Sequence, residues 1–359
     1  MALTKITPDI IKDSSITAAD LAATGTASSA TTLFGNDTWA AVSSSGVLNI
    51  AAADPGTGQT GGNTWFLTGI INYITNMTLA GGVWSTGGEM LETRDYTKGC
   101  GSSGAAIVCG KEYSNVTDEL IGGTWSAGGN MLFTGAYQMQ GGLQSAAWMA
   151  GGRAEGSGTN RTDAALYDGT SWSATGSLNT GVWLGQGFGL QSAGVACGGN
   201  DGNFSDTTEE FDGTSWSAVN NMLSNRGEGV ATGILTAGLT CGGEAAPGGL
   251  TSSEEYDGTC WTAGGSVPIT GSGNKGQGGT GLQTAAIMWG GNAAPKNVTT
   301  EYDGSTWASV GNLNIGRGSL SGGAGSVSAG ICAGGRDSGN NKLQSTEEWN
   351  KVTIQFIGV

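Results

Sequence analysis

Short apolar segments recur along most of the chain, and each ends in a pair of glycines. They occupy residues 148–152, 195–199, 239–243, 287–291 and 331–335. Apolar runs this short, bounded by turn residues, are typical of buried β-strands, whereas helices need ten or more residues. The glycine pair marks a strand end at which backbones approach closely. The pattern therefore predicts an all-β protein made of many short strands and tight turns.

Tryptophan and Asp-Gly mark two further positions of the same unit. An aromatic residue followed by Asp-Gly stands five residues before four of the tryptophans, and Asp-Gly is typical of a tight hairpin. Successive tryptophans are 41, 47, 44, 45 and 46 residues apart, which is the length of one four-stranded propeller blade. We expect these anchors to pack between blades: Trp84, Trp125, Trp172, Trp216, Trp261 and Trp307.

A glycine doublet, an aromatic residue and a tryptophan at near-fixed spacing resemble the kelch repeat over roughly residues 46–359. The resemblance implies a kelch-like β-propeller, and the two ends of the chain decide its blade count. Residues 66–84 align without gaps on residues 107–125, and Ile354 falls in the tryptophan position 47 residues after Trp307. We therefore expect seven four-stranded blades. Six is the alternative, if the first half-repeat supplies a closing strand to the last blade.

Residues 1–45 hold no repeat and are rich in Ala, Ser and Thr. Their Met-Ala-Leu-Thr-Lys-Ile-Thr-Pro start and the segment 35–39 resemble the N-terminal attachment arm of tailed-bacteriophage structural proteins. We expect an extended arm at 1–45 and a propeller at 46–359. The resemblance implies that the arm binds other virion proteins; a flexible terminus is the alternative.

Composition excludes several classes of function. The chain has no histidine and no Cys-x-x-Cys pair, which removes structural zinc sites and Ser-His-Asp triads, as well as the copper radical oxidases of the kelch family. No cofactor or metal is expected. A net charge of −15 argues against nucleic-acid binding, and no apolar run is long enough for membrane insertion.

Cys109, Cys197 and Cys241 share one repeat position, which predicts buried reduced thiols; a Cys100–Cys109 bridge is the alternative.

Paired carboxylates are the remaining candidates for catalysis, because glycosidases use two of them. Glu209-Glu210, Glu254-Glu255 and Glu347-Glu348 occupy the same repeat position, however. A repeated pair indicates scaffold rather than a unique acid and base. The Asp of each Asp-Gly turn has a similar explanation, since Asp caps its own turn. We therefore expect a protein that is not an enzyme.

Basic residues gather on one side of the expected ring. In an antiparallel blade, the loop between the second and third strands emerges on the same face as the link to the next blade, and 11 of the 14 basic residues fall in these segments. Variable loops on a rigid scaffold are a usual place for recognition, while the opposite face carries monotonous acidic hairpins. Trp183, Phe204 and Tyr137 could stack on sugar rings. The binding candidates are Arg153, Arg161, Trp183, Phe204, Arg226, Lys275, Lys296, Arg317 and Arg336.

Together these features predict a non-enzymatic phage virion structural or adhesion protein, such as a tail fibre, adhesin or appendage component. It would assemble in the host cytoplasm, act in the extracellular particle as a homo-oligomer or in many copies, and bind a host-surface glycan or protein. The alternatives are a capsid or neck decoration protein and a glycan-processing enzyme.

Overall fold

The computed structural model describes residues 82–351 except 112–113, 155, 247, 269–274 and 320–321, and in addition four strands outside that range. Contacts divide the chain into two units, Trp84–Trp349 and the remainder. In the remainder, β1 (Thr31–Phe34) pairs with β2 (Thr38–Ala41), and β3 (Val47–Asn49) pairs in parallel with β32 (Thr353–Gln355). Every regular element of the described residues is a β-strand.

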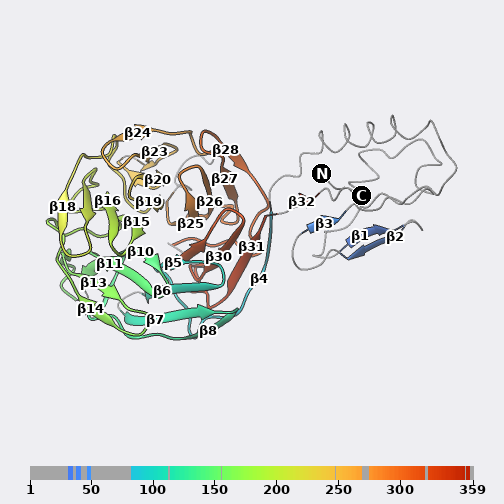
Figure 1. The fold of residues 1–359 in the computed structure, drawn as a ribbon, viewed down its shortest axis with the longest axis horizontal. Coiled ribbons are helices and arrows are strands. Elements are labelled where there is room, and N and C mark those ends of the chain that lie inside the picture. The colour runs from blue at the N-terminus through green and yellow to red at the C-terminus, as the bar shows by residue number, and fades with distance from the viewer. Residues whose placement is uncertain are drawn as a thin grey trace. The chain divides into compact units, whose positions relative to one another are not determined.

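The larger unit is a ring of six four-stranded blades (Figure 1). Each blade runs from an inner strand at the axis to an outer strand at the rim. The first three blades are β5 (Lys98–Gly101), β6 (Ala105–Lys111), β7 (Ser114–Ile121) and β8 (Thr124–Ala127); β10 (Met139–Leu143), β11 (Ala146–Ala150), β13 (Ala164–Tyr167) and β14 (Trp172–Ala174); β15 (Gln186–Leu190), β16 (Ala193–Cys197), β17 (Thr208–Phe211) and β18 (Trp216–Ala218).

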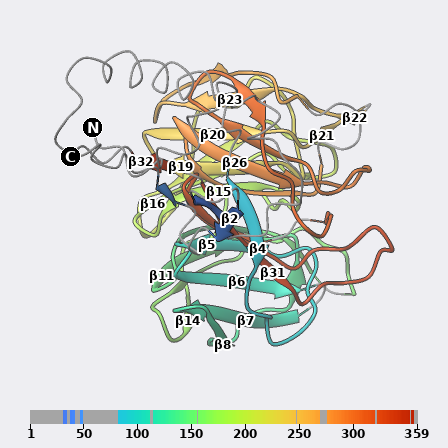
Figure 2. The ribbon, with the colours of Figure 1, turned by 90° about the vertical axis from the view of Figure 1, so that its right-hand side faces the viewer.

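The other three blades repeat this order of strands. They are β19 (Val230–Ile234), β20 (Ala237–Cys241), β23 (Ser253–Tyr256) and β24 (Trp261–Ala263); β25 (Gln277–Leu282), β26 (Ala285–Gly290), β27 (Thr299–Tyr302) and β28 (Trp307–Ser309); β29 (Gly322–Gly325), β30 (Ala329–Ala333), β31 (Thr346–Asn350) and β4 (Val83–Thr86). Short strands in the loops add β9 (Gly135–Ala136), β12 (Arg153–Ala154), β21 (Glu244–Ala245) and β22 (Gly248–Gly249); Figure 2 shows the β21–β22 hairpin at the edge of the ring.

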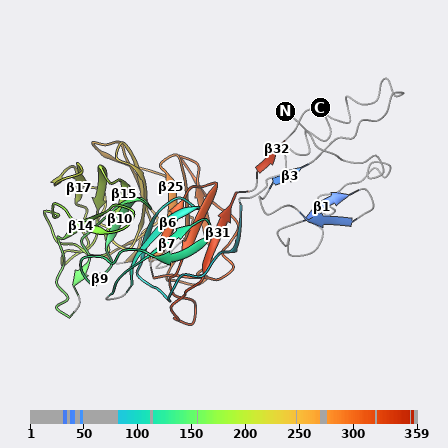
Figure 3. The same cartoon turned by 60° about the horizontal axis from the view of Figure 1, so that its bottom comes forward.

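The all-β propeller prediction is confirmed, but the prediction of seven blades is wrong and the alternative of six is correct. The outer strand of the sixth blade is β4, which precedes the first blade in sequence and pairs with β31 (Figure 3). Trp84 fills the tryptophan position there, with its ring centroid 5.4 Å from that of Trp349. Ile354 instead lies in β32, paired with β3. The two half-repeats at the chain ends thus share one blade, which closes the ring. Residues 50–81 of the predicted first repeat, and residues 1–45 apart from β1 and β2, lie outside the described residues.

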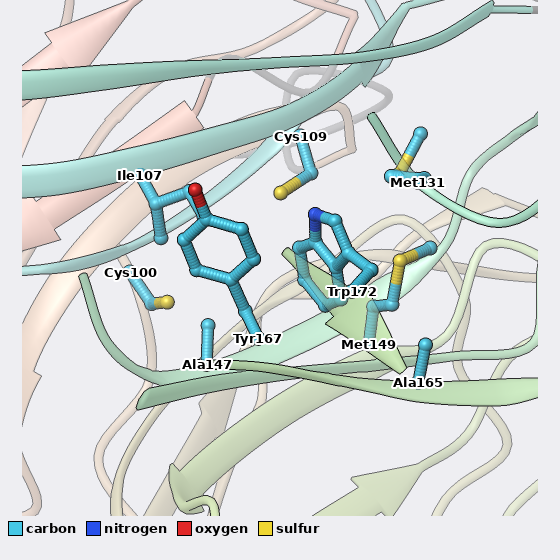
Figure 4. Packing of buried hydrophobic residues seen from close by; sticks show 9 residues of the cluster. All are labelled: Cys100, Ile107, Cys109, Met131, Ala147, Met149, Ala165, Tyr167 and Trp172. Atoms are coloured by element: carbon cyan, nitrogen blue, oxygen red, sulfur yellow. The ribbon is translucent and has the colours of Figure 1, made fainter. Parts of the chain in front are cut away.

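Tryptophans join each blade to its neighbour. All six anchors are at most 9% exposed. The indole N–H of Trp172 donates to Thr117 Oγ1 at 3.1 Å, and that of Trp261 donates to Thr208 Oγ1 at 3.0 Å. Figure 4 shows Trp172 and Tyr167 of the second blade packed with Cys109 and Ile107 of the first. The core therefore lies between blades rather than within one of them.

Inner strands meet so closely at the axis that side chains would not fit. A Cβ on Gly187 would lie 2.9 Å from the Gln140 carbonyl oxygen, and a Cβ on Gly323 would lie 2.5 Å from that of Gly279. The glycine-rich inner strands are therefore a packing requirement of a small ring.

Candidate functional site

The two faces of the ring are built from different segments. One face, here the linker face, carries the links between blades and the loops between second and third strands, such as residues 175–185 and 198–207. The other, the hairpin face, carries the two tight turns of each blade, such as residues 191–192 and 212–215. The sequence predicted recognition on the linker face.

Each link between blades leads into the inner strand of the next blade, and a residue just before that strand has the left-handed backbone conformation. Tyr96, Tyr137, Leu184, Glu228 and Ser319 have φ between 53° and 64°, and Gly276 has φ of 71°. Non-glycine residues adopt this conformation at a cost of about 1–3 kcal/mol, so its repetition needs a structural reason. Backbone hydrogen bonds between successive blades supply one.

All six inner strands line a narrow space at the axis, here called the central channel, with Lys98 and Gln140 among its lining residues. The hydrogen bonds run around its mouth on the linker face. Leu184 N donates to the Tyr137 carbonyl at 3.3 Å, Glu228 N to that of Leu184 at 2.9 Å, and Gly276 N to that of Glu228 at 3.0 Å. Tyr96 N likewise donates to the Ser319 carbonyl at 2.8 Å. The left-handed turns thus fix these residues around the channel on the linker face.

Three aromatic residues line one half of this mouth. The ring centroids of Tyr96 and Tyr137 are 4.5 Å apart, and those of Tyr137 and Trp183 are 5.1 Å apart. The Arg336 guanidinium lies 5.5 Å from the centroid of Tyr96, and that of Arg153 lies 4.6 Å from the centroid of Trp183. All five side chains are half-buried. We call Tyr96, Tyr137 and Trp183 the aromatic arc; it spans the entrances to three consecutive blades.

The facing half of the mouth is polar. Asn292 Nδ2 donates to Glu228 Oε2 at 3.4 Å, and Lys275 forms an ion pair with Glu244 at 2.8 Å. Burial raises the pKa of Glu228, an effect that the nearby Lys275 ammonium opposes. Lys98 lies inside the channel, where burial lowers its pKa to about 8 although Glu228 acts in the opposite direction. The mouth therefore combines stacking surfaces with hydrogen-bonding groups.

The other binding candidates are half-buried and contact neighbouring segments of the linker face. Arg161 pairs with Asp163 at 2.7 Å and lies 4.7 Å from the ring centroid of Phe133. Lys296 Nζ donates to the Asp337 carbonyl at 3.0 Å. Phe204 covers Gly227, where a Cβ would lie 2.8 Å from its ring. These contacts fix the side chains in place on the linker face.

Arg226 and Arg317 require a correction, because both are fully buried. Arg226 pairs with Glu254 at 2.6 Å and donates to the Gly242 carbonyl at 3.0 Å. Arg317 makes the same contacts with Glu347 and Gly334. A buried guanidinium with its carboxylate and carbonyl partners satisfied is a structural ion pair, so neither arginine can contact a partner.

A signal for this burial exists within the chain. Arg94, which stands at the same position in its own link, is also fully buried and pairs with Asp118 at 2.7 Å. In the second blade, where Gly135 replaces the arginine, Ala165 replaces the acid. The exchange is visible in the sequence once the two repeat positions are aligned, but it is partial, because the third blade keeps Glu209 although Val182 stands at the arginine position.

Carboxylates of the repeated pairs also join blades. The first accepts backbone N–H groups of the incoming link, as Glu209 does from Asn179 at 2.9 Å and Thr180 at 3.1 Å. In two of the three pairs the second accepts a tyrosine hydroxyl of the following blade, as Glu210 does from Tyr256 at 2.6 Å, whereas Glu348 stands opposite Leu120. The repeated carboxylates are thus used by the scaffold, as their repetition predicted.

Five of the six cysteines are buried, and Cys260 is exposed. All six cysteines are free thiols, and burial raises the pKa of Cys197 and of Cys241 to about 12. Over the described part of the chain, His, Cys, Asp and Glu side chains form no group of three that could hold a metal ion. The same residues include no helix with the length and apolar character needed to cross a membrane.

Comparisons with known proteins support the fold alone. No protein-family model and no curated protein matches the chain. Among solved structures, the one entitled "Structure of YjhT" aligns with a TM-score of 0.62 at 13% identity, over 72% of this chain and 95% of that chain. At this identity the similarity establishes the propeller and says nothing about its ligands.

Proposed function

We propose that this protein is a non-enzymatic phage virion structural and adhesion protein, a tail-fibre, adhesin or appendage component that displays a kelch-like propeller. The observation that carries the proposal is the aromatic arc at the mouth of the linker face. Two further features support it: the repeated carboxylates are engaged in the scaffold, and residues 1–45 resemble a phage attachment arm.

The chemistry of the mouth fits a host-surface glycan. Sugar rings present an apolar face of C–H groups, which stacks on aromatic rings, and a rim of hydroxyls, which hydrogen-bond. Tyr137 and Trp183 offer the first kind of contact, and Glu228 and Asn292 on the facing half offer the second. Each such contact is weak, so a particle with many copies would rely on avidity.

Substitution of the arc tests the proposal. The double variant Tyr137→Ala and Trp183→Ala should bind host cells and a glycan array at least tenfold more weakly than the native protein, because each aromatic contact contributes about 1 kcal/mol. Leu132→Ala, an exposed residue of the same face, serves as the matched control, with melting temperature as the control for folding.

Three outcomes would contradict the proposal. Normal cell binding by the double variant would remove the arc from recognition. Incorporation into particles without any cell binding would indicate a decoration protein. Turnover of a bound glycan would indicate an enzyme.

A further inference from the structure

Four exposed aliphatic side chains lie together on the hairpin face. They end the inner strands β10, β15, β19 and β25, which are consecutive around the axis and contact one another. Serines occupy the corresponding position in the first and sixth blades, Ser102 and Ser326. We call the four residues the aliphatic crescent: Leu143, Leu190, Ile234 and Leu282, which are 51%, 46%, 44% and 53% exposed. Contiguous apolar groups of this kind are unusual on a surface without a partner.

The same four blades place an acidic turn outside the crescent. The carboxylates of these turns accept the backbone N–H groups of their own hairpins, as Asp212 does from Thr214 and Ser215, both at 2.8 Å. These hydrogen bonds lower the pKa of each carboxyl, so all four stay charged at neutral pH. The acidic turns begin at Asp168, Asp212, Asp257 and Asp303.

We propose that the aliphatic crescent and its acidic turns form a docking surface for a protein with an apolar centre and a rim of Lys and Arg. The docking is independent of the glycan site on the linker face. Apolar burial would supply affinity, and the matching charges would set orientation and exclude other partners.

Charge argues against two occupants that this chain itself could supply, a second copy placed face to face and residues 1–81. A second copy placed face to face would bring two sets of acidic turns together, in a protein of net charge −15. Residues 1–81 hold two lysines, Lys5 and Lys12, against five aspartates. The strand β32 near the C-terminus is already paired with β3.

Binding of short labelled amphipathic peptides, followed by fluorescence anisotropy, tests the proposal with the full chain. A peptide of Leu and Lys should bind with an affinity that falls as salt is raised, and a peptide of Leu and Glu should not bind. Replacing all four crescent residues by Ser should weaken binding at least tenfold. Replacing Leu91, Leu132 and Leu223 by Ser is the matched control, because these equally exposed leucines lie on the linker face, and it should change little.

Further variants and a sedimentation measurement distinguish the proposal from the alternatives. Exchanging the four turn aspartates for Asn should weaken binding and reduce its salt dependence. Trp183→Ala should bind the peptide normally, so that failure of the glycan site and failure of this surface remain distinguishable. Equal binding of both peptides, or equal binding by the crescent and control variants, would overturn the proposal. A dimer in sedimentation that the crescent variant abolishes would also overturn it, since the occupant would then be a second copy.

Discussion

Two of the six anchor tryptophans, Trp125 and Trp216, lack the hydrogen-bond partner that the other four possess. The indole N–H groups of Trp84, Trp172, Trp261 and Trp307 donate to a Thr or Ser on the third strand of the preceding blade. Trp216 faces Ala164 at that position, and its Nε1 is buried without a hydrogen-bond partner. A buried donor left unpaired costs about 1–3 kcal/mol.

Supplying the missing acceptor should stabilise the protein. Ala164→Ser adds one hydroxyl at the position where Ser253 already serves Trp307, and we expect a gain of about 1 kcal/mol in the free energy of unfolding, measured in urea. The reverse change, Thr208→Ala, should cost about 1–3 kcal/mol by orphaning Trp261. A loss of stability in Ala164→Ser would show that the interface has no room for the oxygen.

Removing an anchor should be far more damaging than removing its hydrogen bond. Trp216 is 5% exposed, and its ring centroid lies 5.2 Å from that of Trp148 and 4.9 Å from that of Phe211. Trp216→Ala should therefore lower the free energy of unfolding by about 3–5 kcal/mol. An unchanged melting temperature would show that this position does not anchor the blade.

From the sequence, the binding candidates could be assigned to segments of the linker face, but the burial of each side chain could not be predicted. Arg153 and Arg226 both lie in segments of the linker face, yet one lies half-buried over Trp183 and the other is enclosed beside Glu254. That difference depends on which carbonyls and carboxylates converge in space. Tyr96 was not a candidate, because its contact with Tyr137 joins two blades and leaves no local pattern.

At the scale of elements, most neighbouring blades are matched in polarity. Glu119 accepts the Tyr167 hydroxyl at 2.7 Å, and Glu255 accepts that of Tyr302 at 2.5 Å. Between the second and third blades both positions are apolar, Leu166 and Phe211. At four of the six interfaces the acid and the tyrosine are therefore present or absent together, whereas Glu301 and Glu348 stand at the acid position opposite Trp349 and Leu120.

These pairs should make the fold sensitive to alkaline pH. Burial, aided by the Glu255 carboxylate, raises the pKa of Tyr302 to about 12, above the ordinary tyrosine value of about 10. The folded state thus holds its proton more tightly than the unfolded state. This contribution to stability is complete below about pH 10 and is lost as the pH rises toward 12. In Tyr302→Phe the free energy of unfolding should fall less steeply between pH 10 and 12; an unchanged slope would exclude the pair as its source.

Glycine doublets and Asp-Gly turns located the strands well because both are local requirements. The strand β16 ends at Cys197, immediately before Gly198 with φ of 63°, as the doublet predicted. The turn at Asp212 joins β17 to β18 as expected. The blade count was less accessible, since the local pattern is the same whether two half-repeats form one blade or two.

At the scale of the whole molecule, stability rests on a closure made by distant segments. Trp84 packs its ring against Trp289 with centroids 5.1 Å apart and donates to Thr299 Oγ1 at 3.0 Å. Both partners lie more than 200 residues away in sequence. Without β4 the outer edge of β31 would be left unpaired, and an exposed strand edge favours aggregation.

Truncation at two nearby points separates the arm from this closure. Deleting residues 1–81 removes none of the six blades, so the protein should stay folded with a nearly unchanged melting temperature. Deleting residues 1–86 also removes β4, whose tryptophan alone should be worth about 3–5 kcal/mol, so the sixth blade should open and the melting temperature should fall sharply. Trp84→Ala in the full chain, which keeps the strand and loses the ring, should lie between the two. A synthetic peptide of residues 82–90 added to the shorter protein should restore much of the loss by re-forming the outer strand. If both truncations melt alike, β4 does not close the ring, and the count of six blades would have to be revised.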